Sequence, residues 1–180
     1  MKLTILGNDQ ELDLAIRQAD VAIRPAMLHQ PDLVQQYLMT WHLKLYASKS
    51  YLEQFGVPEK IEDLNDHQLL TFAEDTTSPY GNINWLLRLG AQLNQQRTPY
   101  LSINSTQGLQ QAAEAGLGIA AISIEYPGLK NSKLIQVLPQ VEGPEIDIYY
   151  VYPGQLKHSK RVTVLGDYLA DVLKQQYDIK

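Results

Sequence analysis

NSTQGLQQAAEAGLGIAAIS, residues 104–123, carries the clearest structural signal in this 180-residue chain. Asn104, Ser105 and Thr106 are residue types that accept hydrogen bonds from free helix N–H groups. Gln107 follows Asn104 by three residues, a spacing that resembles a capping box. We therefore expect a helix to begin here with a polar first turn. Such a turn can face a ligand, and it favours a binding domain over a catalyst.

The second half of the same segment predicts the end of this helix and the element after it. Leu109, Ala112 and Ala113 recur at helical spacing, and Gly116 stands where a left-handed residue commonly ends a helix. Residues 119–122 then form a short apolar run, which is typical of a strand covered on both faces.

Composition excludes several classes of function. The formal net charge of -5 argues against a surface that neutralises phosphates, and the chain has no cysteine for a disulfide or a thiolate metal site. The four histidines lie without metal-ligand spacing, and no nucleophile motif accompanies them. We expect no metal, no cofactor and no catalytic group. The chain shows neither a signal peptide nor a run of about 20 apolar residues, which favours a cytoplasmic protein without membrane contact.

The N-terminal quarter predicts a strand, helix, strand unit. Residues 3–6 are expected to form a strand, Asp9 to cap a helix, and residues 21–23 to form a second, buried strand. A right-handed crossover joins parallel strands in such a unit and leaves their ends as a shelf for ligands. Asn8, Arg24 and Pro25 lie on that shelf.

Further elements are expected along the chain. Ser48 can cap a short helix that ends at Gly56, and the final segment, 162–173, has the apolar spacing of an amphipathic helix. A loop is expected over residues 74–82. The apolar runs expected to form strands are 43–47, 69–72, 83–87, 100–103, 134–137 and 146–151.

Several motifs in this order resemble one family, the effector-binding domain of the LysR-type transcriptional regulators of bacteria. The match extends almost from end to end, and it is the order and spacing of the motifs that is specific. The motifs are ADVAIRP (19–25), LYASKSYLEQFGVP (45–58), EDLNDHQLLTF (62–72), the segment 104–123, LIQVLP (134–139), IYYVYP (148–153) and SKRVTVLGDYL (159–169).

The resemblance implies an α/β fold like that of type II periplasmic binding proteins. Two Rossmann-like lobes are joined by two crossover strands, and a small polar or anionic metabolite binds in a cleft between them. Residues 1–46 with 147–180 would form lobe one, and 47–146 lobe two. The positions that match the effector contacts of the family are Asn8, Arg24, Pro25, Thr76, Ser105 and Thr106.

The chain departs from the family pattern at its N-terminus. The family carries a DNA-binding winged helix-turn-helix, a linker helix, and the first strand and helix of lobe one before the matched region. We therefore expect an incomplete lobe one and DNA binding only through the missing domain. The full-length family forms homodimers or tetramers.

Alternatives stay open at this point. Ser105 and Thr106 can be simple helix caps, and Arg24 can be a solvated or structural ion-pair partner instead of a ligand contact. A solute-binding receptor of an ABC-type uptake system would share the fold. An enzyme on the same fold is a more distant alternative, because it needs a catalytic pair that the sequence does not offer.

Overall fold

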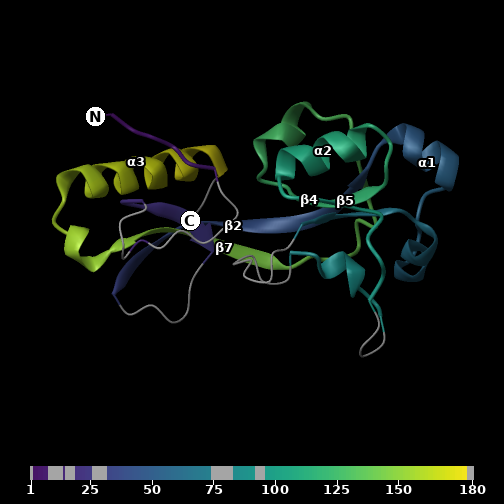
Figure 1. The fold of residues 1–180 in the computed structure, drawn as a ribbon. Helices are drawn as coiled ribbons and strands as arrows, with labels where there is room; N and C mark the ends of the chain where they lie inside the picture. The colour runs from purple at the N-terminus through teal and green to yellow at the C-terminus, as the bar shows by residue number, and fades with distance from the viewer. Residues whose placement is uncertain are drawn as a thin grey trace. The chain divides into compact units, whose positions relative to one another are not determined.

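A computed structural model describes residues 2–7, 14, 19–25, 32–73, 83–91 and 96–177 of the chain. The chain divides into two compact units, and strands β2 (Leu33–Ala47) and β7 (Glu145–Pro153) run through both (Figure 1). The described residues of unit one lie within 2–41 and 146–177, and those of unit two within 42–145.

Unit one is a small sheet with the C-terminal helix. Its strand order is β1-β7-β2, and β1 (Ala22–Pro25) pairs antiparallel with β7 so that Arg24 lies opposite Tyr149. A 3-10 turn, η4 (Gly154–Leu156), leads into α3 (Lys160–Tyr177), the yellow helix of Figure 1. The buried Tyr150 hydroxyl donates to the Val162 carbonyl oxygen at 2.9 Å, which fixes α3 against β7.

Unit two has the strand order β2-β5-β3-β4. Parallel pairing joins β3 (Leu69–Phe72) to β5 (Ile119–Ser123) and to β4 (Leu101–Ile103). Antiparallel pairing joins β2 to β5 and to β6 (Ile135–Val137). The helices of this unit are α1 (Lys49–Phe55), η1 (Ile61–Asp66), η2 (Trp85–Leu87), α2 (Thr106–Glu114) and η3 (Pro127–Asn131).

The core of unit two lies between this sheet and its helices. Helix α2 packs on β3, β4 and β5, and its buried residues are those predicted from helical spacing. Burial of large aliphatic side chains is the main stabilising term in such a core. The largest fully buried side chains of unit two are Tyr51, Leu45, Leu64, Leu69, Leu70, Leu86, Ile119, Ile122 and Val137.

Many predicted elements are confirmed. Strands occur at or within two residues of the expected bounds 21–23, 69–72, 100–103, 119–122, 134–137 and 146–151. Ser48 caps α1, since its hydroxyl accepts from the Tyr51 amide at 3.3 Å, and Gly56 ends that helix with φ 86°. Gly116 has φ 81°, the left-handed conformation expected after α2.

The predicted strand over residues 3–6 is wrong. These residues form no regular element, and the side chains of Leu3, Ile5 and Leu6 are 55%, 89% and 61% exposed. An apolar tetrapeptide becomes a strand only when a neighbouring strand satisfies its backbone, and no described strand pairs with this segment. The helix expected after Asp9 lies outside the described residues.

The predicted strand over residues 83–87 is also wrong, because the chain forms the 3-10 helix η2 there. The Asn84 side chain accepts from the Phe72 amide at 2.9 Å and donates to the Phe72 carbonyl at 2.7 Å. This side chain takes the place of a neighbouring strand at Phe72. The three apolar residues after Asn84 are buried in a helical turn, which a short apolar run permits as readily as a strand.

Strand β2 is longer than predicted. The sequence indicated a strand only from Leu43, whereas one continuous strand of 15 residues begins at Leu33. Polar residues such as Gln35, Gln36 and His42 interrupt its apolar pattern, so its first half gives no strand signal. The predicted lobe boundaries at 46/47 and 146/147 stay a prediction. Among the described residues, no helix is both long and apolar enough to cross a membrane.

Candidate functional site

Among the predicted site residues, those at the start of α2 have the best-defined surroundings. Ser105 has extended backbone angles, and its hydroxyl oxygen accepts from the Gly108 amide at 3.1 Å. Ser105 is therefore the N-cap, and the capping reading of this residue is confirmed. The capping box expected between Asn104 and Gln107 is wrong by one position, because the third residue after the true cap is Gly108, which has no side chain to complete a box.

Gly108 allows the tight turn at this site. A Cβ atom at this position would lie 2.5 Å from Cγ2 of Ile103 and 2.9 Å from the Ser105 hydroxyl oxygen. The chain thus leaves β4, turns at Ser105 and enters α2 with the cap and the strand end in direct contact.

The cap leaves several donors for a ligand. The first N–H groups of a helix have no partner within it, and Ser105 satisfies that of Gly108 alone. Within the part of the chain that the structure describes, the amides of Thr106 and Gln107 remain without a partner, and so does the hydroxyl hydrogen of Ser105. The half-buried Thr106 hydroxyl has no hydrogen-bond partner among the described residues. These groups lie at the positive end of the helix dipole, which favours an anionic or polar ligand group.

Neighbouring strand ends add two hydroxyl groups that the sequence did not single out. Thr71 on β3 and Ser102 on β4 share a hydrogen bond of 2.8 Å between their side-chain oxygens. Thr71 is buried and Ser102 is exposed. The pair could have been found only by aligning β3 with β4, which places Thr71 directly opposite Ser102. It joins β3 to β4, the strand that precedes the cap.

The remaining predicted contacts belong to unit one or lie outside the described residues. Arg24 and Pro25 are adjacent on β1, and both are buried, Arg24 to 8% exposure. Burial excludes the solvated reading of Arg24 and leaves a structural or a ligand role, because a buried guanidinium needs a polar or charged partner. Asn8 and Thr76 lie outside the described residues.

A shallow hollow of about 390 Å³ lies elsewhere on unit two. Glu114, the last residue of α2, contributes to its wall, whereas Thr106 is the first, so the hollow is about 12 Å away along the helix axis. The predicted effector contacts that the structure describes, Arg24, Pro25, Ser105 and Thr106, do not line it. Its lining residues are Ser48, Lys49, Ser50, Glu114, Asn131, Lys133 and Leu134.

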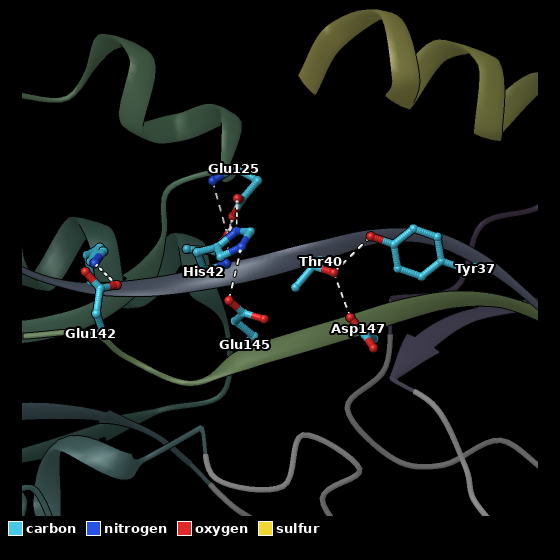
Figure 2. A network of polar contacts seen from close by, with 9 residues as sticks. Tyr37, Thr40, His42, Glu125, Glu142, Glu145 and Asp147 are labelled. Carbon is cyan, nitrogen blue, oxygen red and sulfur yellow. Dashed lines mark hydrogen bonds and ion pairs between the residues drawn. The ribbon is translucent and has the colours of Figure 1, made fainter. Parts of the chain in front are cut away.

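His42 takes part in a polar cluster that the sequence did not predict (Figure 2). Its Nδ1 atom lies 2.6 Å from Glu125 Oε1, and its backbone amide donates to Glu125 Oε2 at 2.9 Å. Its Nε2 atom lies 3.7 Å from Glu145 Oε1. The three residues are far apart in the sequence, so no spacing signal connects them. No group of three or more metal-binding side chains occurs within the described part of the chain.

The sequence matches the LysR substrate binding domain family over residues 2–174. Among curated relatives, an uncharacterised HTH-type transcriptional regulator of Haemophilus influenzae is 31% identical over 87% of this chain and 54% of its own length. CrgA of Neisseria meningitidis serogroup C, an HTH-type transcriptional regulator, is 27% identical over 96% of this chain and 58% of its own length. The chain thus spans little more than half of these relatives.

Solved structures agree with the family match. The regulatory domain of CrgA, a LysR-type transcriptional regulator from Neisseria meningitidis, superimposes with a TM-score of 0.75 at 27% identity, over 89% of this chain and 78% of that one. The regulatory domain of AphB from Vibrio vulnificus shares the fold with a TM-score of 0.66, over 95% of this chain and 83% of that one. The fold is that of the type II periplasmic binding proteins.

The two strands shared by the units, the capped α2 and these matches define a regulator's ligand-binding domain. The chain belongs to the LysR family, as a LysR substrate binding domain. Its homologues are transcriptional regulators, which favours this reading over an uptake receptor.

Proposed function

We propose that this chain is the effector-binding part of a cytoplasmic transcription regulator and that a small polar or anionic metabolite binds at the start of α2. The observation that carries the proposal is the set of donors at Ser105, Thr106 and Gln107 that have no partner among the described residues. Family membership supplies the context, since the relatives are transcriptional regulators.

The chemistry of the α2 start favours an anion such as a carboxylate. Each group there that lacks a partner is a hydrogen-bond donor or a hydroxyl, and the helix dipole adds positive potential. A carboxylate oxygen can accept from the Thr106 amide and hydroxyl together, while the Ser105 hydroxyl donates to the same group. A cationic ligand would meet unfavourable potential at this position.

Unit one would contribute the second set of contacts. A guanidinium binds a carboxylate through two parallel hydrogen bonds, which suits the buried Arg24. Pro25, Asn8 and Thr76 belong to the same proposal because they occupy matching positions of the family. Substitution of each residue in turn tests its contact with the ligand separately.

The proposed mechanism is a shift of population between conformations of the domain. A ligand shifts such an equilibrium only by the difference between its affinities for the two states. In the parent protein, a homodimer or tetramer, this shift would reach DNA through a separate winged helix-turn-helix. The chain would bind its ligand without transforming it.

Solved structures suggest a first group of compounds. The effector binding domain of QuiR has been solved in complex with shikimate and has a TM-score of 0.67 with this chain. At 16% identity this likeness concerns the fold alone. The choice of probes rests on the donors at the α2 start, which favour a carboxylate, and shikimate and other small hydroxylated or aromatic carboxylic acids carry that group.

A thermal-shift screen of such acids tests the proposal. A ligand at 100 times its Kd stabilises the folded state by about 2.7 kcal/mol through mass action. We expect at least one acid to raise the Tm of the wild type and of Lys133→Ala, which alters only the distant hollow, and to lose its effect in Ser105→Asp. A ligand that loses its effect in Lys133→Ala and keeps it in Ser105→Asp would contradict the proposed site.

A further inference from the structure

Strands β2 and β7 each extend from unit two into unit one, and the residues at these two crossing points are neighbours. On β2 the last residue of unit two is His42, and on β7 it is Glu145. Next to this pair, the Leu43 amide donates to the Pro144 carbonyl at 3.4 Å. This hydrogen bond holds β2 against the residue that precedes β7.

One side of His42 is held firmly by Glu125. The Glu125 side chain is only 10% exposed, and it accepts hydrogen bonds from the Ser123 hydroxyl, the His42 amide and the His42 ring. Burial raises the pKa of Glu125, but these hydrogen bonds outweigh it and hold the pKa below its ordinary value. Glu125 therefore stays ionised wherever histidine changes its charge, and Nδ1 of His42 carries the hydrogen of the 2.6 Å contact.

The contact of the other ring nitrogen, Nε2, depends on the charge of His42. In the neutral ring Nε2 presents a lone pair to the Glu145 carboxylate, so the two groups cannot form a hydrogen bond. In the protonated ring Nε2 becomes a donor. The present separation of 3.7 Å is within ion-pair range, and Glu145 is 72% exposed and can move closer. We propose that His42, Glu125 and Glu145 form a pH-sensitive contact, the His42 cluster, that joins β7 to β2 when His42 is protonated.

The other charged and titratable groups around His42 are engaged in contacts of their own. On the same strand, Lys44 forms an ion pair with Glu142, and this pair contains no histidine. Along β7, Asp147 accepts a hydrogen bond from the Thr40 hydroxyl at 2.6 Å (Figure 2). Tyr46 lies near Glu125, and burial together with that carboxylate raises its pKa. Histidine is the side-chain type that ordinarily changes its charge between about pH 5 and 8, and His42 is the histidine of this cluster.

The consequence is a regulatory property of the fold. At mildly acidic pH the Nε2 contact adds to the β2–β7 junction, and at alkaline pH it is absent. Local separation of β2 from β7 next to the hydrogen bond from Leu43 to Pro144 then becomes harder as the pH falls. The contact needs no ligand, so its test is independent of the proposed effector site.

Hydrogen exchange of the Leu43 amide reports the opening of this junction. We compare wild type with Glu145→Gln at about pH 5.5 and again at about pH 8, because histidine changes charge between these values. Exchange of Leu43 should be about two- to fivefold faster in Glu145→Gln at the lower pH, the range of an exposed ion pair, and equal to wild type at the higher pH. Because the Glu145 side chain is exposed, Glu145→Gln should fold as the wild type does.

Two further variants make the result specific. Glu142→Gln breaks the Lys44–Glu142 ion pair, which contains no histidine, so its effect on Leu43 should be the same at both pH values. In a His42→Gln background the additional effect of Glu145→Gln should vanish. An effect of Glu145→Gln that is equal at the two pH values, or that persists without His42, would overturn the proposal.

Discussion

Gly118 occupies a position between β3 and β5 with no room for a side chain. A Cβ atom there would lie 2.3 Å from the Gln68 carbonyl oxygen, the atom that accepts from the Ile119 amide at 2.8 Å. Its φ of 156° is rare for residues with a side chain. Both conditions follow from strand pairing, so the sequence alone does not show why glycine is required at position 118.

Gly118→Ala should therefore be strongly destabilising. We expect a loss of about 3 kcal/mol or more, because backbone strain and overpacking each cost about 1–3 kcal/mol. Gly56→Ala is the matched control: its φ is 86° and its ψ is 168°, yet nothing lies within 4 Å of a Cβ atom, so it should lose only the cost of backbone strain, about 1–3 kcal/mol. Urea denaturation measures both, and equal losses would contradict the role of the Gln68 contact.

Single residues were predicted well where the reason was local. Ser48, Gly56 and Gly116 act within a few residues of the helices that they cap or end, and the structure bears out these roles. The shift of the α2 cap from Asn104 to Ser105 depends on where β4 ends. The partners of His42 are set by pairing across the sheet, which no local pattern encodes.

At the scale of elements, α2 combines a structural cap with the proposed ligand contacts. Ser105→Ala should cost about 1 kcal/mol of stability, since it removes the acceptor of the Gly108 amide. Ser105→Asp keeps an acceptor and adds a charge that the helix dipole favours, so its stability should stay within about 0.5 kcal/mol of wild type. Urea denaturation of the two variants separates these outcomes, and a wild-type stability of Ser105→Ala would refute the cap's contribution.

The docking of α3 predicts a sensitivity to alkaline pH. Burial raises the pKa of Tyr150 to about 12 in the folded protein from its ordinary value of 10.0. Because the folded state resists ionisation, this contribution to stability is complete below pH 10 and is lost as the pH rises from 10 toward 12. Tyr150→Phe should lose about 1 kcal/mol at neutral pH, with the hydrogen bond to Val162, and should lose less stability than wild type on alkaline titration.

Tyr168→Phe serves as the control for this titration. Tyr168 also lies on unit one, in α3, but its side chain is 63% exposed and donates no hydrogen bond to the described residues. Denaturation as a function of pH should give the wild-type profile for this variant. If Tyr150→Phe kept that same profile, the buried phenol would not be the source of the alkaline loss.

Helices were predicted where apolar spacing or end signals were clear. Its cap and end glycine indicated α1, apolar spacing indicated α3, and both kinds of signal indicated α2. Residues 3–6 have the composition of a strand without a described partner, and residues 83–87 are apolar but begin with Asn84, whose side chain holds Phe72. A strand depends on a neighbour that is distant in sequence, so the composition of a short run does not determine it.

At the scale of the whole molecule, the family resemblance predicted the fold more fully than composition and periodicity did. The resemblance of ordered motifs predicted the fold class, and the match over residues 2–174 confirms it. Composition and periodicity alone indicated an α/β protein with a polar helix start. The identity of the ligand depends on the shape and charge of the complete site, which no motif of this chain records.

The central claim is that an anionic or polar effector binds at the start of α2 through Thr106, and titration calorimetry of Thr106→Val tests it most directly. The ligand is an acid that raises the Tm of the wild type. Loss of a hydroxyl that bonds a charged group costs about 1.5–3 kcal/mol, so we predict an affinity about 10- to 100-fold weaker with an unchanged Tm of the free protein. Thr98→Val, at an exposed position of unit two, should bind as wild type does. An unaltered affinity in Thr106→Val would contradict the claim.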